Sequence, residues 1–246
     1  MSLISVVTVT FNNAAGLRET LGSLAQLQCG PLEIVVVDGG SSDDTPAVVR
    51  EFESRLPLSF TSEPDRGIYD GMNKGHGRCR GDLVHYLNAG DTVFGEPYAK
   101  VTQDCLLPVQ VHDESGRFFF EEFVRHSGFG YCHQGILFPR DHPSYRLEYR
   151  VAADLDVMIA TYPRGMNGLP RALAGGVRYA LGGVSSQAGS ERDREVRKIF
   201  FSRLPWWIAS RLQAGIVMKN LLPRSLRRAL VKNLRGAETA DRSRHG

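Results

Sequence analysis

The stretch that decides the fold occupies residues 32–46 and reads LEIVVVDGGSSDDTP. Its first six residues are mostly apolar and β-branched, which is typical of a strand buried in a parallel sheet. The strand ends at Asp38, and the glycines and serines after it predict a loop. The last residues of the loop supply a helix cap, and Pro46 favours a first helical turn, so we expect a helix over residues 46–55.

The same alternation extends in both directions along the chain. Residues 3–10 predict a second buried strand, and leucines at helical spacing predict a helix over residues 14–27. Downstream we expect a strand at 58–62, a helix at 67–78 and a strand at 83–87. Strands that alternate with helices form right-handed βαβ units, so the sequence predicts an α/β fold with a mostly parallel sheet flanked by helices.

The second half of the chain has a less regular pattern. We expect strands at 118–120 and 135–138 and a helix at 152–162. A largely apolar helix is expected over 205–222, and a second short helix follows Pro223.

Polar clusters follow each of the first four expected strands, at residues 8–13, 38–44, 63–66 and 88–91. In open α/β sheets, ligands bind beyond the carboxyl ends of the strands. The sequence therefore predicts a binding site at this edge of the sheet.

Two of these clusters carry carboxylates that allow two interpretations. Asp38 and the turn from Asn88 to Asp91 can be ordinary turn residues. Alternatively, Asp38 accepts an N–H group of a nucleobase, and Asp91 is an oxygen ligand of the kind that Mg²⁺ or Mn²⁺ prefers. A nucleoside diphosphate brings further oxygen ligands, so one or two protein carboxylates would suffice.

Four segments in this order resemble family 2 glycosyltransferases, especially the branch that builds bacterial exopolysaccharides such as colanic acid. They are residues 5–13, 33–45, 62–75 and 87–91. The resemblance implies a GT-A fold, which binds nucleoside-diphosphate sugars, over residues 1–190.

The resemblance also implies a division of the chain by function. Residues 1–91 would form the donor-nucleotide half and residues 92–190 the acceptor half. Residues 191–246 would form a basic, amphipathic helical tail.

The resemblance places the sugar-donor site in the four motifs. Thr8 and Asp38 stand where the family binds the nucleobase and ribose, and Arg66 lies in a segment that approaches the base and diphosphate. Asp91 matches the carboxylate that holds Mg²⁺ or Mn²⁺, although Asn88 and Gly90 replace the aspartates that many members carry. The further donor-binding candidates are Phe11, Asn12, Asp65, Asn73 and Asn88.

The catalytic base is expected near the start of the helix at 152–162. Asp154 matches the family's base, with Asp156 as the second choice; the alternative is that Asp154 only caps the helix. Possible substrate contacts by the same resemblance are His133, Gln134, Gly183 and Ser185.

The implied reaction is a metal-dependent, inverting single displacement. A sugar would pass from a nucleoside-diphosphate sugar to a saccharide acceptor, expected to be lipid-linked, in cell-surface polysaccharide biosynthesis. The alternative is a nucleotide-sugar-binding protein without catalysis. A dinucleotide-dependent oxidoreductase is disfavoured, because no Gly-x-Gly-x-x-Gly motif follows the first strand.

The tail differs from the body in charge. Residues 192–246 carry 14 basic and four acidic side chains, whereas the preceding residues carry 16 basic and 23 acidic ones. Trp206 and Trp207 precede an apolar segment, and leucines at 226, 230 and 234 share one face of a basic helix. This pattern is typical of a helix lying on an anionic membrane, here over residues 203–235, but the apolar face could instead pack on the catalytic domain.

Nucleic acid is not an expected partner, because no recognised binding motif accompanies the positive charge. The four cysteines are scattered, and we see neither a secretory leader nor an apolar run of about 18 residues. We therefore expect a cytoplasmic protein that associates with the inner face of the cytoplasmic membrane.

Overall fold

The computed structural model describes residues 2–28, 32–112, 118–122, 129, 131–180 and 189–221. The chain divides into two compact units, residues 1–196 and 197–246.

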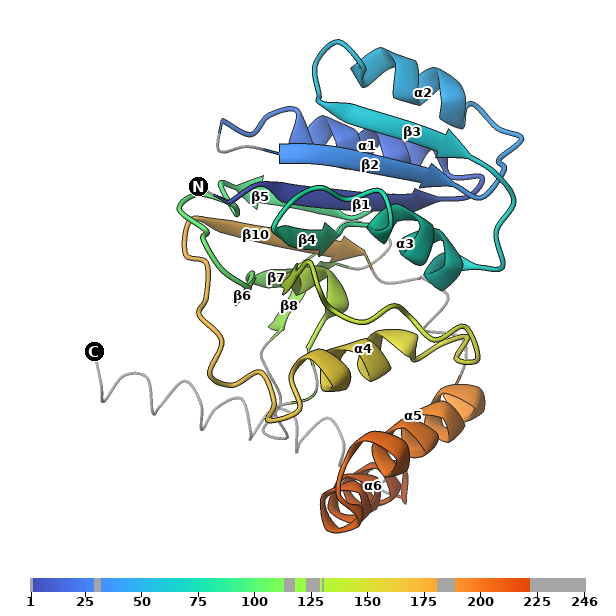
Figure 1. Cartoon of the computed structure of the whole chain (residues 1–246), viewed down its shortest axis with the longest axis vertical. Helices are drawn as coiled ribbons and strands as arrows, with labels where there is room; N and C mark the ends of the chain where they lie inside the picture. Colours follow the sequence, from blue (N-terminus) through green and yellow to red (C-terminus); the bar gives the residue numbers. More distant parts are fainter. Residues whose placement is uncertain are drawn as a thin grey trace. The chain divides into compact units, whose positions relative to one another are not determined.

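A six-stranded sheet with the order β3-β2-β1-β4-β9-β6 forms the centre of the first unit. Strands β1 to β4 are parallel, whereas β9 runs antiparallel to β4 and β6. The arrowheads of β1, β2 and β3 point the same way in Figure 1, so the carboxyl ends of these strands share one edge. The strands are β1 (Ile4–Thr10), β2 (Leu32–Asp38), β3 (Leu58–Ser62), β4 (Leu83–Tyr86), β6 (Cys105–Leu106) and β9 (Ile136–Pro139).

Helices cover both faces of the parallel strands. Alternate residues of a strand point to opposite faces, and Ile4, Val6, Ile34 and Val36 pack in one core with the apolar sides of α1 (Ala14–Leu24) and α2 (Thr45–Phe52). The helix α3 (Ile68–His76) contacts β1 and β2 on the other face.

Glycines allow α3 to lie close to the sheet. A Cβ atom at Gly75 would lie only 2.4 Å from Cγ1 of Val7, and one at Gly71 would lie 3.2 Å from Cγ1 of Val9. The motif that contains both glycines is therefore partly explained by helix–sheet packing. The close packing of α3 also holds the polar residues of this motif near the edge of the sheet.

A second sheet of four strands has the order β5-β10-β7-β8. Strand β10 pairs antiparallel with β5 and parallel with β7, and β8 is antiparallel to β7. Strands β5 (Thr92–Gly95), β7 (Val109–His112), β8 (Phe118–Glu122) and β10 (Gly175–Ala180) are short. Val93, Val109 and Val177 join these strands to the same hydrophobic core as the larger sheet.

The expected elements of the first 91 residues are confirmed to within three residues at their ends. The expectation of a mostly parallel sheet holds for β1 to β4 but not for the later strands, where antiparallel pairing dominates. The later strands pair mostly with partners that are distant in the sequence and do not follow the strand–helix alternation of β1 to β4, so the two sheets together are mixed. Strands β5, β6, β7 and β10 were not predicted, because their two to six residues show no clear period.

Three helices and one helical turn complete the described part of the chain. The turn η1 (His133–Gly135) leads into β9, and α4 (Ala153–Thr161) lies close to the predicted position. Helix α5 (Gly189–Arg203) begins in the first unit. Most of it falls in the expected helical tail, but its bounds were not predicted, because the segment is highly polar.

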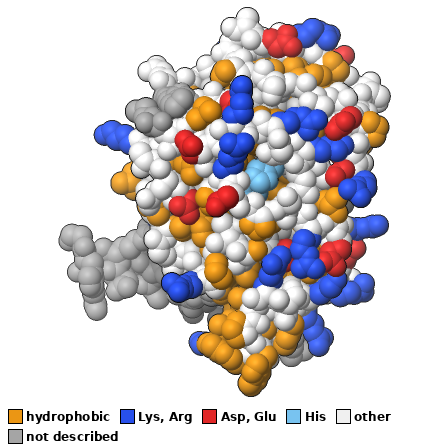
Figure 2. Space-filling model, viewed as in Figure 1, with side chains coloured by type: hydrophobic (Ala, Val, Ile, Leu, Met, Phe, Trp, Pro, Cys, Tyr) orange, Lys and Arg blue, Asp and Glu red, His pale blue; other side chains and the backbone are white. Residues whose placement is uncertain are grey.

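The second unit contains the rest of α5 and α6 (Trp206–Leu221), which matches the expected apolar helix. Figure 2 shows hydrophobic side chains gathered over α6, and Trp206 and Trp207 are exposed by 75% and 58%. Within the described ranges, no helix has the length and apolar character needed to cross a bilayer. The expected leucine face at 226–234 lies outside the described residues.

Candidate active site

The loops after β1 and β2 are hydrogen-bonded to each other at the carboxyl edge of the sheet. The backbone N–H of Asn12 donates to Oγ of Ser41 (2.7 Å), and Oδ1 of Asn12 accepts from the N–H of Ser42 (2.9 Å). Asn12 has a φ of 47°, in the left-handed region that asparagine tolerates better than most residues. Asn12 therefore fixes the shape of the edge.

Asp38 is fully buried at the end of β2. Its carboxylate accepts hydrogen bonds from the N–H of Ser41 (3.0 Å), the hydroxyl of Ser41 and the hydroxyl of Ser62 (2.6 Å). A carboxylate offers about four acceptor positions, so most of this capacity orders the loop after β2 and the end of β3.

Gly39, Asp65 and Phe11 meet beside this loop. A Cβ atom at Gly39 would lie 2.8 Å from Oδ2 of Asp65 and 3.3 Å from the ring of Phe11, so any larger residue would displace one of them. The Phe11 ring is 62% exposed, which is unusual for a large apolar side chain. Next to Asp65, the guanidinium of Arg66 is exposed and lies 3.4 Å from Asp70.

The turn from Asn88 to Asp91 is anchored on α1. Gly90 adopts a φ of 105°, and its N–H donates to Oγ1 of Thr20 (3.0 Å). The Thr20 hydroxyl in turn donates to the carbonyl of Asp91 (2.7 Å). These contacts hold Asp91 immediately before β5, close to the end of β4.

The oxygen atoms near this turn suit a hard divalent cation. Oδ1 of Asn88 is buried without a hydrogen-bond partner, and so is Oγ1 of Thr8 on β1. An unpaired buried oxygen is costly unless something later binds it. Across the ranges that the structure describes, no group of three or more His, Cys, Asp or Glu residues is placed to hold a metal ion. Asp91 and Asn88 thus fit Mg²⁺ or Mn²⁺ in chemistry, but further ligands would have to come from a substrate.

The two carboxylates of α4 have different surroundings. Asp156 is fully buried and lies 3.8 Å from the guanidinium of Arg146, which indicates a structural ion pair. Asp154 is only partly buried, and its Oδ1 accepts from the N–H of Leu155 (2.8 Å).

The environment of Asp154 shifts its pKa upward. Burial raises the pKa of this carboxyl, while the Leu155 N–H, Arg192 and the Tyr69 hydroxyl oppose the rise, and the net pKa lies above the ordinary value for aspartate. The helix cap at residue 152 is an alanine with no side-chain hydrogen bond, so Asp154 does not act as the N-cap. A partly exposed carboxylate with a raised pKa has the character of a general base.

His133 lies in the interior, and the neighbouring Gln134 is partly buried. His133 is buried, its Nε2 shares a hydrogen bond with the hydroxyl of Tyr145 (2.5 Å), and burial together with His142 and His85 lowers its pKa to about 3. The carbonyl of Gln134 pairs with a ring nitrogen of His85 (2.7 Å). These contacts indicate neutral, structural histidines.

Asn73 is also engaged by the protein itself. Its side-chain amide donates to the carbonyl of Tyr145 (2.8 Å) and accepts from the N–H of the same residue (2.8 Å). It therefore ties α3 to the loop before α4. Gly183 and Ser185, the remaining candidates, lie outside the described residues.

Three residues near Asp154 were missed by sequence reasoning. Tyr69 lies inside a recognised motif but was given no role, and Arg192 and Glu195 fall in the segment assigned to the tail. The only sequence signal was the pair of alanines at 152 and 153, which leaves the start of α4 without a local cap.

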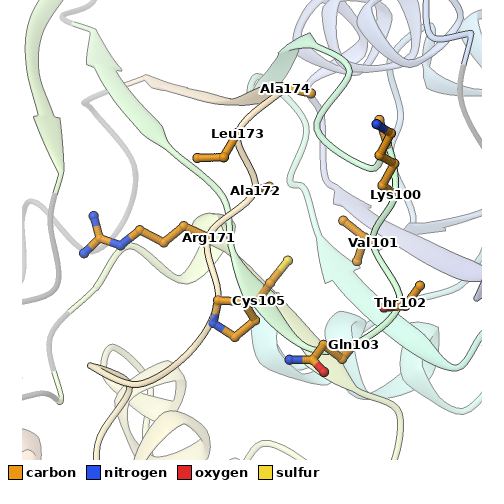
Figure 3. A pocket seen from close by; sticks show the side chains of 11 residues that line it. Lys100, Val101, Thr102, Gln103, Cys105, Arg171, Ala172, Leu173 and Ala174 are labelled. Carbon is orange, nitrogen blue, oxygen red and sulfur yellow. The ribbon is translucent and has the colours of Figure 1, made fainter. Parts of the chain in front are cut away.

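A cavity of about 560 Å³ lies elsewhere in the first unit, between residues 99–105 and 170–174. Figure 3 shows Val101, Cys105 and Ala172 around it, and its lining is mainly apolar. The hydroxyl of Ser2 donates to the carbonyl of Thr102 (3.2 Å), which places this wall near the start of β1. The cavity is therefore at the opposite edge of the sheet from Asp38 and Asp91.

Known proteins resemble the chain in sequence and in fold. Residues 5–101 match the family model described as Glycosyl transferase family 2. The PGL/p-HBAD biosynthesis glycosyltransferase of Mycobacterium bovis is 28% identical over 93% of this chain and 94% of its own length.

Two solved structures share the fold. S. aureus TarS 1–349 in complex with UDP-GlcNAc has a TM-score of 0.64 at 17% identity, over 87% of this chain and 71% of that one. The mannosyltransferase PcManGT from Pyrobaculum calidifontis, in complex with GDP-Man and Mn²⁺, has a TM-score of 0.58 at 17% identity, over 97% and 80%. The chain thus has a GT-A-like α/β fold. The match of residues 5–101 to the family model, the relative along nearly the whole chain and the shared fold together make this chain similar to family 2 glycosyltransferases.

Proposed function

We propose that this protein transfers a sugar from a nucleoside-diphosphate sugar to a saccharide hydroxyl by a single inverting displacement. The observation that carries the proposal is that hydrogen bonds join the loop after β1 to the loops after β2 and β4 at one edge of the sheet. Asp38 and Asp91 are held at this edge by hydrogen bonds of their own. The match of residues 5–101 to the family model and the similarity to the mycobacterial glycosyltransferase support a glycosyltransferase activity. The structure of TarS contains UDP-GlcNAc, and that of PcManGT contains GDP-Man. Both ligands support a nucleoside-diphosphate sugar as the donor.

The nucleotide would bind along the loops after β1 to β3. The exposed ring of Phe11 offers a surface on which a base can stack, and the remaining acceptor position of Asp38 can receive a base N–H. The exposed guanidinium of Arg66 is a cation suited to a diphosphate. Thr8, Asn12, Asp65, Asn73 and Asn88 complete the proposed donor site, where Asn12 and Asn73 act through the backbone that they order.

A divalent cation, Mg²⁺ or Mn²⁺, would be held by Asp91 with the oxygen of Asn88 nearby. When bound, such a cation neutralises charge that builds on the leaving diphosphate. The Mn²⁺ complex of PcManGT supports the use of a metal in this fold.

Asp154 would act as the base. Its carboxylate takes the proton from the acceptor hydroxyl while that oxygen forms a bond to the anomeric carbon. The bond from the anomeric carbon to the diphosphate oxygen breaks on the opposite side, which inverts the configuration. Asp156, paired with Arg146, would support the helix instead.

The acceptor is proposed to be a lipid-linked saccharide of cell-surface polysaccharide synthesis, as in the exopolysaccharide branch. The exposed Trp206 and Trp207 and the basic character of residues 203–235 support a site of contact with an anionic membrane surface. The protein would then work at the cytoplasmic face of the membrane, with residues 1–190 as the catalytic domain. His133, Gln134, Gly183 and Ser185 would contribute to the acceptor side, His133 from beneath the surface.

The test is release of nucleoside diphosphate from UDP-GlcNAc, UDP-glucose and GDP-mannose with Mn²⁺, with an octyl glycoside or water as acceptor. We expect Asp91→Asn to reduce turnover by about 10²-fold or more and to weaken Mn²⁺-dependent donor binding, measured by thermal shift. Asp141→Asn, at an exposed position, is the matched control. A protein that binds a nucleotide sugar but never releases the diphosphate would be the non-catalytic binder, and equal donor affinity with and without EDTA would refute the metal site.

A further inference from the structure

The helix that carries Asp154 begins without a cap of its own. The residue before α4 is Ala152 and the first helical residue is Ala153, and no side chain at the cap accepts a hydrogen bond. The first N–H groups of a helix have no partner inside the helix, and alanine is a poor residue at this position. The start of α4 therefore depends on groups from elsewhere in the chain.

Glu195 of α5 holds the N-cap residue and the two residues before it. One of its carboxylate oxygens accepts from the N–H of Arg150 (2.7 Å), and the other accepts from the N–H groups of Val151 (3.0 Å) and Ala152 (2.9 Å). Three successive backbone amides thus converge on one side chain from more than 40 residues away in the sequence. Hydrogen bonds to a charged acceptor are stronger than those between neutral groups.

Tyr69 of α3 approaches the same turn. Its hydroxyl donates to the carbonyl of Val151 (3.0 Å), and its ring stacks on Tyr145 with centroids 5.5 Å apart. The same hydroxyl interacts with Asp154. Tyr69 belongs to the motif that borders the proposed donor site, so it connects that site to the proposed base.

Arg192 completes the arrangement. It lies three residues before Glu195 and thus on the same face of α5. It acts electrostatically on the carboxylate of Asp154 and favours its ionised form. The neighbours of Asp154 from three elements are then Tyr69, Arg192 and its own Leu155 N–H.

We propose that Glu195 is a positioning residue for the reaction: it clamps the three amides before α4 and so fixes where Asp154 stands, while Tyr69 and Arg192 act on the same carboxylate. This inference rests on the proposed role of Asp154 as the base. A base must lie within hydrogen-bonding reach of the acceptor hydroxyl, and a displacement of about 1 Å can cost about 10²-fold in rate. The clamp is thereby a requirement for turnover rather than for binding of the sugar donor.

The experiment compares Glu195→Gln and Glu195→Asp with the control Glu191→Gln, which removes the same charge from an exposed position one turn earlier on α5. In Glu195→Gln one acceptor oxygen is replaced by an NH₂ group that faces backbone N–H groups. The donor is UDP-GlcNAc, UDP-glucose or GDP-mannose, whichever the parent protein uses. We expect the turnover number of Glu195→Gln to fall about 10-fold or more, and the KM for that donor to stay within about twofold of the parent value. Glu195→Asp should recover part of the loss, and Glu191→Gln should match the parent.

Two further measurements separate positioning from loss of fold. In the Asp154→Asn background, Glu195→Gln should cause less than about a twofold further loss, because a residue that acts through Asp154 has nothing left to position. Hydrogen exchange of the amides of residues 150–152 should quicken in Glu195→Gln, while exchange in β1 and β2 stays as in the parent.

Several results would overturn the proposal. Parental turnover in Glu195→Gln, or fully additive losses with Asp154→Asn, would exclude a positioning role. Unchanged exchange at residues 150–152 would exclude the clamp itself. If exchange quickens but Asp154→Asn keeps parental turnover, the assignment of Asp154 as the base is the part that has failed, and the positioning role falls with it.

Discussion

Three buried histidines should make the first unit sensitive to mild acid. Burial lowers the pKa of His85 to about 4, that of His133 to about 3 and that of His142 to about 4. The ordinary value for histidine is 6.5. Acidification from pH 7 to pH 5 is the perturbation, because it protonates these rings in the unfolded chain and leaves them neutral in the folded one.

The sign follows from proton binding. Between pH 6.5 and about 4 the unfolded chain binds more protons than the folded chain, so the free energy of unfolding falls as the pH falls through this window. At pH 5, protonation stabilises the unfolded chain by about 2 kcal/mol for each of these histidines, because the same ring stays neutral in the folded chain. For the three histidines together, the free energy of unfolding should fall by about 6 kcal/mol. That is comparable to the whole stability of a typical domain. The raised pKa of Asp154 has the opposite effect on the free energy of unfolding, because the folded chain takes up that proton more readily than the unfolded chain. It concerns one group, whereas three histidines act against it.

The assay is urea unfolding at pH 7 and pH 5, followed by far-UV circular dichroism and by the near-UV signal of the tyrosines. Tryptophan fluorescence does not report on this unit, because both tryptophans, Trp206 and Trp207, lie in the second unit. His142→Gln should reduce the loss between the two pH values by about 2 kcal/mol, whatever it does to stability at pH 7. A parent protein whose free energy of unfolding differs by less than about 1 kcal/mol between pH 7 and pH 5 would refute the reasoning.

Three other changes test the remaining structural arguments. Gly75→Ala should destabilise the protein by about 1–3 kcal/mol in the same urea titration, because the added methyl group would collide with a valine of β1. The control Gly77→Ala, whose added methyl group would have no neighbour closer than 3.6 Å, should change stability by less than about 0.5 kcal/mol. Asp154→Asn should lower turnover by about 10²-fold or more with unchanged donor affinity. If Asp154→Asn keeps the turnover of the parent while Asp156→Asn is inactive, Asp156 is the base instead. Removal of residues 203–246 should abolish salt-sensitive binding to anionic vesicles in a flotation assay while donor binding persists, and an insoluble truncation that cannot bind donor would mean that the tail belongs to the core.

The sequence by itself determined the fold of residues 3–91. Buried β-branched runs, a proline at a first helical turn and glycine-rich loops are local signals, and each of them predicted an element that the structure contains between residues 3 and 91. The order of those elements was enough to predict which edge carries Asp38 and Asp91, because parallel strands joined by right-handed crossovers end on the same side. The assignment of a chemical role to each residue at that edge stays a prediction.

Only the tertiary structure decided the remainder. Strand β10 lies between β5 and β7, although these segments are far apart in the sequence, and such pairings leave no local signal in strands of four to six residues. The same holds for the start of α4: the sequence shows two alanines, and only the fold brings Glu195 to the amides of residues 150–152 and the Tyr69 hydroxyl to the carbonyl of Val151. His133 shows the converse, since a polar residue that resembled a substrate contact is buried and paired with Tyr145. Local patterns encode which face of an element is apolar, whereas the hydrogen-bond partners of backbone amides and buried rings are set by distant residues that meet only after folding.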